Sequence, residues 1–449
     1  MACKLKYFSK PLQVRKVIPH TLLLVALAII LLPQFNLANQ PLGEHQHGSN
    51  NVEFPTNQLH PSVQRKLAEV NKPAIKSIQS ADGDVIDCVP MEQQPAFDHP
   101  LLKGHTIREY PSSRPYATTR NSTRMMPHKG HWQLWKESGE TCPQGTVPIR
   151  RTSPSDVLRA SSIQRFGRKA RAQHLNITLS QKPVAPHITQ HDSAPSAHDH
   201  AIAYVSGGVY FGSTATINVW DPSVEDRSEF SLSQMWILAG PFNGDLNTIE
   251  VGWQVSPELY GDSHPRFFIY WTADAYEQTG CYNLLCSGFI QTSNAIAMGA
   301  SISPWSKDHS SQYDIKILIW KDPEKGDWWM EFGDRVLVGY WPAKLFTHLR
   351  NKATVIEWGG EVAQAISPSL PRRHTKTHMG SGRFAQAGFG HASYFRNVEV
   401  VNSENQLETI STLSTSADHP SCYNIRAFYN SNWGNFFYYG GPGRNPACP

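Results

Sequence analysis

The stretch Thr248-Ile-Glu-Val-Gly-Trp-Gln-Val255 indicates the fold class of this 449-residue chain, because apolar and polar or small residues alternate along it. Successive side chains on a β-strand point to opposite faces. The four apolar side chains from Ile249 onward therefore share one face, which packs into a core. Glu250, Gly252 and Gln254 share the other face. The stretch predicts a strand with one apolar face and one polar face.

A second stretch, Val355-Ile-Glu-Trp-Gly-Gly-Glu-Val362, follows the same rule and places Glu357, Gly359 and Glu361 on one face. In both stretches a glycine separates two polar positions, which leaves room for a ligand to approach. Two glutamates on such strands can form a carboxyl pair in which one acts as base and the other as acid. Spacing alone favours a simpler interpretation, that they are solvent-facing, because nothing local shows that the strands are neighbours.

Outward from these stretches, residues 201–449 form a series of short segments with Gly, Asn-Gly and Asp-Pro turns between them. Charged residues are few (17%), and 13 Trp and 16 Tyr are present. This pattern predicts an all-β fold, an antiparallel β-sandwich. The expected strands are 203–205, 215–220, 230–238, 248–255, 266–272, 313–320, 328–332 and 335–340, with one short helix at 345–349.

The first 200 residues have a different organisation. Residues 1–38 combine a basic start with the apolar run Thr21–Leu32, which predicts a signal peptide; an uncleaved anchor is the alternative. Residues 39–152 predict a small mixed prosegment, with a helix at Pro61–Val70 and a hairpin around Gly83. Residues 153–200, basic and then rich in Pro and His, predict an exposed linker in which activation cleavage occurs, followed by a catalytic domain at 201–449.

Cysteine usage supports export. Cys3 precedes the apolar run, and the remaining six cysteines are an even number, which predicts disulfides. Six cysteines allow fifteen pairings; pairing neighbours along the chain joins Cys88 to Cys142, Cys281 to Cys286 and Cys422 to Cys448. Sequons at Asn121 and Asn176 predict glycosylation. No metal site is expected, because the cysteines lack CxxC spacing and have no histidine at ligand spacing.

Charge divides the chain in two. Residues 1–200 contain 24 Lys and Arg against 14 Asp and Glu, whereas residues 201–449 contain 17 against 23. A basic N-terminal half and an acidic C-terminal half attract each other. The basic residues are dispersed and accompany no binding motif, so nucleic-acid binding is not expected.

Longer strings resemble the plant neprosin family of proline-directed glutamic endopeptidases over nearly all of the chain after the signal. The strings that resemble its activation peptide are Asp87-Cys-Val, Gln94-Pro-Ala-Phe-Asp-His-Pro-Leu-Leu102, Thr141-Cys-Pro-Gln-Gly and Pro148-Ile-Arg-Arg151. Those that resemble its catalytic domain are Asn247–Val255, Arg266–Asp274, Thr279–Asn283, Gly339–Pro342, Glu357–Glu361, Met379–Gly382 and Tyr438–Gly443. His378, where Gln is expected, and the linker from about 153 to 190 depart from the family pattern.

The resemblance implies an antiparallel β-sandwich with an open groove, the neighbour-paired disulfides, and Glu250 with Glu361 as catalytic pair. Glu357 is then structural or supporting. We expect a secreted zymogen, in the extracellular space, cell wall or vacuole, that hydrolyses peptides next to proline at acid pH without a cofactor. Gln254 is a candidate oxyanion donor. Candidates for stacking on a proline ring are Tyr270, Trp271 and Trp358.

The expected partners are peptide substrates and the chain's own prosegment as inhibitor, with no nucleic acid, no membrane after signal removal, and a monomeric state. Two alternatives remain. A glycoside hydrolase also uses two carboxyl groups, although here the glutamates lie on distant strands. A non-catalytic cell-wall protein of the same fold is the other, and the intact glutamate pair argues against it.

Overall fold

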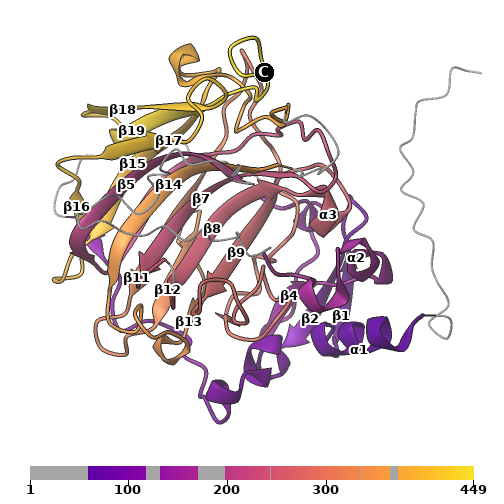
Figure 1. Cartoon of the computed structure of the whole chain (residues 1–449). Helices are drawn as coiled ribbons and strands as arrows, with labels where there is room; N and C mark the ends of the chain where they lie inside the picture. Colours follow the sequence, from indigo (N-terminus) through magenta and orange to yellow (C-terminus); the bar gives the residue numbers. More distant parts are fainter. Residues whose placement is uncertain (1–58, 118–131, 170–197, 243, 334, 365–372) are drawn as a thin grey trace, which may run out of the picture. The chain divides into compact units, whose positions relative to one another are not determined.

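The computed structural model describes residues 59–117, 132–169, 198–242, 244–333, 335–364 and 373–449, all of which belong to one unit, Val52–Pro449. Its central part is two stacked antiparallel sheets, seen in Figure 1 with β5, β14, β7, β8 and β9 in front of β11, β12 and β13. The all-β sandwich predicted from alternation is therefore confirmed. No helix among these residues is both long and apolar enough to cross a membrane.

Six strands make the sheet that carries both predicted glutamates. In spatial order they are β17 (Ser414–Ala417), β5 (His198–Tyr210), β14 (Ala353–Ala363), β7 (Phe230–Ala239), β8 (Asn247–Val255) and β9 (Arg266–Thr272). All neighbouring pairs are antiparallel. β5 starts at His198, so the first strand of this sheet begins inside the stretch expected to be linker.

Ten strands make the second sheet. Eight follow the order β10 (Ile290–Gln291), β13 (Val336–Trp341), β12 (Trp328–Phe332), β11 (Asp314–Lys321), β6 (Gly212–Asn218), β15 (Ser393–Val401), β16 (Gln406–Thr409) and β3 (Tyr116–Ala117). The other two are β19 (Gly434–Gly440), which pairs with β15, and β18 (Asn424–Asn430), which pairs with β19. β3 comes from the prosegment and joins β16 in parallel.

The hydrophobic core lies between these two sheets. It contains the apolar face of β8, including Ile249 and Val251, and that of β11, including Ile317 and Ile319. Buried tryptophans join the sheets: Trp253 Nε1 on β8 donates to the carbonyl of Asn218 at 2.9 Å. The opposite face of the six-stranded sheet bears the glutamates, and we call it the glutamate face.

The N-terminal elements form a small unit beside β9 (Figure 1). It contains α1 (Pro61–Val70), the sheet β1 (Lys76–Gln79), β2 (Val85–Pro90) and β4 (Thr146–Arg150), α2 (Pro154–Arg159), and short 3₁₀ turns at Met91–Gln93, Pro95–Asp98, Pro100–Leu102, Leu134–Lys136 and Ile163–Arg165. The predicted helix and hairpin are confirmed. The helix expected at 345–349 is wrong: that region has only a 3₁₀ turn, Ala343–Leu345. A further 3₁₀ turn lies at Ala385–Ala387, and α3 (Pro257–Tyr260) is a short α-helix.

The six cysteines after Cys3 form three disulfides between neighbours along the chain. Cys88 joins Cys142 inside the N-terminal unit, and Cys281–Cys286 and Cys422–Cys448 lie in the sandwich. Disulfides of this kind persist in oxidising compartments. Both predicted glycosylation sites, Asn121 and Asn176, lie outside the described residues.

Candidate active site

β7 separates the two strands that carry the predicted catalytic glutamates, and it pairs with both. Across β14, β7 and β8 the glutamate face consists of three rows, Glu357–Trp236–Glu250, Gly359–Gln234–Gly252 and Glu361–Leu232–Gln254. Glu250 and Glu361 therefore lie at opposite corners of one patch. The structure brings together two side chains that are 111 positions apart in the sequence.

Lys169 connects the two glutamates. Its Nζ lies 2.5 Å from Glu250 Oε2 and 3.7 Å from Glu361 Oε2, and all three side chains are buried. Burial alone lowers the pKa of Lys169, but the two carboxylates more than offset this effect and its net pKa is raised. One ammonium group from upstream of the sandwich thus pairs with both carboxylates.

The segment before Lys169 is anchored in several places. Phe166 packs in a cluster with Val63 and Val157 of the N-terminal unit. The Gly167 carbonyl accepts the Tyr282 amide at 2.8 Å, and the Lys169 amide donates to the Tyr270 hydroxyl at 3.3 Å. These contacts hold the lysine over the glutamate face.

Glu250 is fully buried and its second oxygen is held by two hydroxyl groups. Oε1 accepts from Thr248 Oγ1 at 2.9 Å and from Tyr276 Oη at 2.7 Å. Burial and the Glu250 charge raise the pKa of Tyr276 well above its usual value, so the phenol keeps its proton. Only Oε2 of Glu250 turns toward Lys169.

The two carboxylate oxygens of Glu361 also have different partners. His198 Nδ1 lies 2.5 Å from Oε1, while Gln234 Nε2 donates to Oε2 at 3.2 Å. Burial alone raises the pKa of Glu361, but Lys169, His198 and His200 more than offset it and hold the pKa well below its usual value. His200 is protonated at neutral pH because Asp418 and the glutamates, against its burial, raise its pKa to about 9.

The arrangement directs the Oε2 atoms of both glutamates toward one point, which the Lys169 nitrogen occupies. A water molecule at that point would contact both carboxyl groups once the lysine had left. Two carboxyl groups in such a geometry can share a proton and divide the tasks of base and acid.

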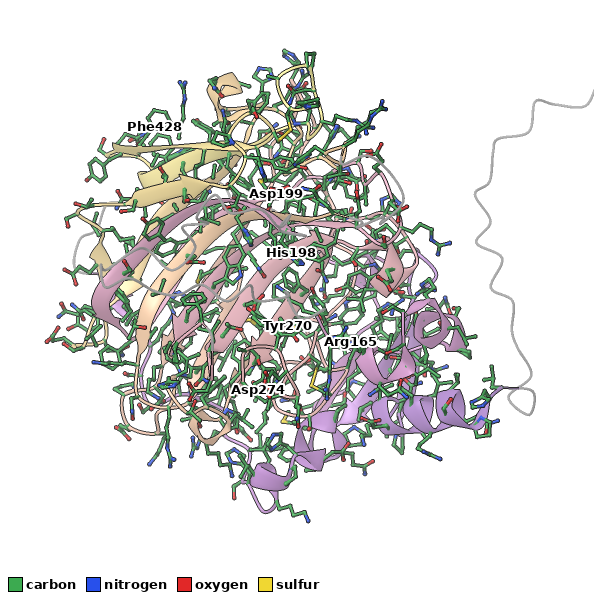
Figure 2. The ribbon with its side chains drawn as sticks, in the orientation of Figure 1. Arg165, His198, Asp199, Tyr270, Asp274 and Phe428 are labelled. Atoms are coloured by element: carbon green, nitrogen blue, oxygen red, sulfur yellow. A yellow bond between two sulfur atoms is a disulfide. The ribbon has the colours of Figure 1, made fainter. Side chains whose placement is uncertain are left out.

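Among the other predicted site residues, Tyr270 lies on this face, opposite Glu250, while Gln254 is held by Tyr260, whose hydroxyl accepts from Gln254 Nε2 at 2.8 Å. Figure 2 labels Tyr270 on β9 and His198 on β5, the two strands that flank β14, β7 and β8 in the sheet. The expectation for Trp271 and Trp358 is corrected. Each follows a glutamate-face residue, so alternation turns it into the core between the sheets.

Glycine is needed between the polar positions for a reason that differs from the one expected. A Cβ on Gly252 would lie 2.0 Å from the Ser233 carbonyl oxygen, and one on Gly359 would lie 2.3 Å from that of Ala201. The missing side chains allow adjacent strands to approach, rather than leaving a space for a ligand.

Glu357 lies two rows away from Glu361 on the same strand, in the row of Glu250. Burial first, and then the charges of Glu250, Asp418 and Glu361, raise its pKa to about 8 against the opposing charge of His200. It therefore carries a proton at acid pH and adds no negative charge to the pair. This agrees with a supporting role.

A second group of ionisable residues lies at the start of β5. Buried Asp199 bonds His374 Nε2 at 2.8 Å and also contacts His419 and Gln364. These atoms lie close enough together to hold a metal ion, but the aspartate oxygens already bond the two imidazoles and the amide. The group is fully accounted for as a hydrogen-bond network.

Sequence reasoning missed Lys169, His198 and Gln234. Lys169 was placed in an exposed linker, and His198 in its histidine-rich end. The available signal was alternation in His198-Asp-His200, which continues the strand pattern of the residues after it. Nothing local distinguishes Lys169 from its basic neighbours.

The fold and the site define a class: an all-β protein whose buried carboxylate pair is covered by an upstream segment of its own chain, as in the precursor of a peptidase. The family model described as Neprosin matches residues 227–442, and the one described as Neprosin activation peptide matches residues 77–204. The chain belongs to the neprosin family. It is a peptidase made as a zymogen, whose prosegment inhibits it and which acts on peptide substrates.

Two solved structures are also similar to this chain. Scytalido-glutamic peptidase with a transition state analog inhibitor has 13% identity and a TM-score of 0.30, covering 54% of this chain and 97% of its own. SCP-B, a member of the Eqolisin family, in complex with the tripeptide Ala-Ile-His, has 13% identity and a TM-score of 0.29, with 55% and 97% coverage.

Proposed function

We propose that the protein is a glutamic endopeptidase, in which Glu250 and Glu361 activate a water molecule for peptide-bond hydrolysis at acid pH. The observation that carries this proposal is the convergence of their Oε2 atoms on one nitrogen, at 2.5 and 3.7 Å. Each Oε1 atom is fixed by neighbours, so the two reacting oxygens are positioned before substrate binds.

Glu361 is the base in this proposal. His198 and His200 remain beside it after Lys169 leaves, and both favour its ionised form. Among the described residues, the side chains other than Lys169 that bond Glu250 are the hydroxyl groups of Thr248 and Tyr276, and we assign the role of acid to Glu250. This division assigns the acid and base roles, which the sequence leaves open.

In the reaction, Glu361 takes a proton from water while the water oxygen bonds to the scissile carbonyl carbon. The carbonyl π electrons move to its oxygen, which the Glu250 proton stabilises. When the tetrahedral intermediate collapses, the carbon–nitrogen bond breaks and the leaving nitrogen takes the proton from Glu250. The proton on Glu361 then returns to Glu250 through solvent, and no covalent enzyme intermediate forms.

The remaining expectations complete the proposal. The preference for proline rests on the family resemblance alone, with Tyr270 as the candidate aromatic contact on the glutamate face. Secretion is supported by three disulfides. The segment after Lys169 is proposed to contain the activation cleavage; it lies outside the described residues.

The experiment uses Glu250→Gln and Glu361→Gln, which keep side-chain volume and remove the titrating group. The proteins are treated with acid, processed in trans by wild-type enzyme, purified, and incubated with proline-containing peptides and with polysaccharides. We expect wild type to cleave peptides only, and both variants to lose cleavage while they stay folded by circular dichroism. Wild-type turnover in either variant, or release of sugars, would contradict the assignment.

A further inference from the structure

Gln234 occupies the centre of the patch between the two glutamates. It lies on β7, one row from Glu250 on the neighbouring strand and one row from Glu361 on the other. The residues directly beside it on both strands are glycines, Gly252 and Gly359. Its amide is therefore the one polar side chain in the middle row of these three strands.

The hydrogen bonds of Gln234 are incomplete. It is fully buried, Nε2 makes one bond, to Glu361 Oε2, and within the described part of the chain Oε1 has no partner. An amide nitrogen carries two hydrogens. A buried polar atom without a partner costs about 1–3 kcal/mol, and such atoms in native proteins call for an explanation. The zymogen thus keeps an amide with bonding capacity left over.

The bond that Gln234 does make fixes its direction. Glu361 Oε2, which accepts from its Nε2, is the oxygen that also lies 3.7 Å from the Lys169 nitrogen. The amide nitrogen is thus next to the point where the two glutamates converge. When Lys169 leaves, this amide nitrogen becomes accessible to a bound substrate.

Gln254, the donor expected from the sequence, also has a buried Oε1 without a partner among the described residues, but its amide nitrogen is directed away from the glutamate pair. Its Nε2 donates to Tyr260 Oη, which also receives Asn283 Nδ2 at 3.2 Å. It lies in the row of Glu361 but two strands away. Of these two glutamines on the glutamate face, Gln234 is the one that adjoins the converging oxygens.

We propose that Gln234 is a catalytic residue whose amide N–H binds the carbonyl oxygen of the scissile bond and stabilises the oxyanion that forms on it. This inference rests on the proposed function of the glutamate pair. As water adds to the carbonyl carbon, negative charge moves to the oxygen; the second N–H of Gln234 donates to it, while the first stays on Glu361. No proton leaves Gln234 in the cycle. Preorganised donors of this kind act on charge that exists only in the transition state.

The test replaces Gln234 by Ala and by Glu in the full chain, processed in trans by wild-type enzyme. Removing one oxyanion donor lowers kcat by about 10²–10³-fold, and we expect this loss in Gln234→Ala at unchanged KM. Gln234→Glu keeps the volume; its protonated form can donate one hydrogen, so activity should be partial at the lowest pH and fall more steeply than wild type as pH rises. Gln291→Ala is the matched control, because Gln291 is a buried glutamine of the other sheet.

A second measurement uses a peptide with a phosphinate in place of the scissile amide, compared with the matched uncleaved peptide. We expect Gln234→Ala to lose affinity for the phosphinate and to keep its affinity for the peptide, since the oxyanion exists only in the tetrahedral form.

Two results would overturn the proposal. One is a folded, processed Gln234→Ala whose kcat stays within about threefold of wild type, because loss of a real donor is far larger. The other is a pure shift of the pH profile with an unchanged maximal rate, which would make Gln234 only a positioning residue for Glu361. If Glu250→Gln or Glu361→Gln is active in the same assay, the function of the pair fails first, and this inference with it.

Discussion

At the residue scale, each glutamate of the pair has one oxygen held by the sandwich and one turned toward Lys169. The anchors differ: hydroxyl groups of Thr248 and Tyr276 hold Glu250, whereas His198 holds Glu361. The lysine satisfies both remaining oxygens in the zymogen. It follows that removing it should affect activation, and removing an anchor should affect catalysis.

Lys169→Met should open the site. The variant removes the one cation shared by two buried carboxylates, and losing one partner of a buried ion pair costs about 3–5 kcal/mol. We expect the zymogen to be less stable in thermal unfolding and to activate at higher pH than wild type. Lys72→Met, which breaks a pair with exposed Asp98 inside the prosegment, is the control. An unchanged activation pH in Lys169→Met would show that the lysine does not hold the zymogen.

His198→Ala should change the pH profile of the mature enzyme. His198 is one cause of the lowered Glu361 pKa, so its removal raises that pKa. Because the base must be ionised, the acid limb of kcat/KM should move to higher pH, with a smaller effect on KM. His348→Ala, at a half-exposed histidine paired with Asp245, should leave the profile in place. A profile identical to wild type in His198→Ala would remove Glu361 from the role of base.

At the element scale, the adjacent strands β14, β7 and β8 determine the site, and two of their glycines let neighbouring backbones come close. β7 separates the glutamate strands, and Gly252 and Gly359 allow backbone approaches that no other residue permits. Each strand turns apolar side chains into the core and polar ones to the glutamate face. The spacing of the carboxyl groups is thus a property of strand packing.

Gly252→Ala should destabilise the sandwich, because its Cβ would lie 2.0 Å from the Ser233 carbonyl oxygen. Overpacking of this kind costs about 1–3 kcal/mol, which differential scanning calorimetry would detect as a lower Tm, with a larger relative loss of activity as β8 moves. At Gly244 a Cβ would make only an ordinary contact with Pro241, 3.5 Å away. Gly244→Ala should therefore keep the wild-type Tm, and equal Tm values in both variants would contradict this account.

At the scale of the whole molecule, ion pairs join the prosegment side to the sandwich. In one the upstream residue is the cation, and in another it is the anion. Lys169 is a cation from upstream that meets acidic residues, whereas Asp84 of the β1–β2 turn is an anion 2.5 Å from Arg266 on β9. Burial alone raises the pKa of Asp84, but Arg266 and Arg150 more than offset it and lower the net pKa. The attraction of a basic half for an acidic half describes only part of this interface.

Acid should separate the prosegment from the sandwich at a pH below the ordinary pKa range of carboxyl groups. Glu361 and Asp84 both have lowered pKa values in the closed state, so their stabilisation is complete above the ordinary values of 4.5 and 3.8 and is lost as pH falls further. We expect the prosegment to be released below about pH 4.5. Size-exclusion chromatography of the cleaved protein measures this release. Release centred between pH 6 and 7 would instead assign the switch to histidines.

Asp84→Asn tests the second ion pair separately. The amide cannot pair with the buried Arg266 guanidinium as an ion, so the prosegment should separate at higher pH and lower salt than in wild type. Asp98→Asn, which lies on the exposed surface of the prosegment, should behave as wild type. If the prosegment of Asp84→Asn is released at the same pH as that of wild type, the pH dependence of release comes from the glutamate pair alone.

The sequence by itself determined the sandwich and the polar face of β8 and β14. The pairing of the three disulfides also drew on the family resemblance. The sequence could determine the sandwich and the polar face because alternation is a local property that a strand of eight or nine residues displays in full. The same alternation also placed Trp271 and Trp358 in the core, on the opposite side from Tyr270 and Glu357, and the expectation that they stack on substrate overlooked it.

Only the tertiary structure decided which side chains meet. Lys169 reaches Glu250 across 81 positions and Glu361 across 192, and Gln234 lies between the glutamates because β7 pairs with both of their strands. No local pattern records such contacts, since they depend on strand order and on the path of the chain across the sheet. The physical reason is that charge pairing acts through space, whereas the sequence orders residues only along the chain.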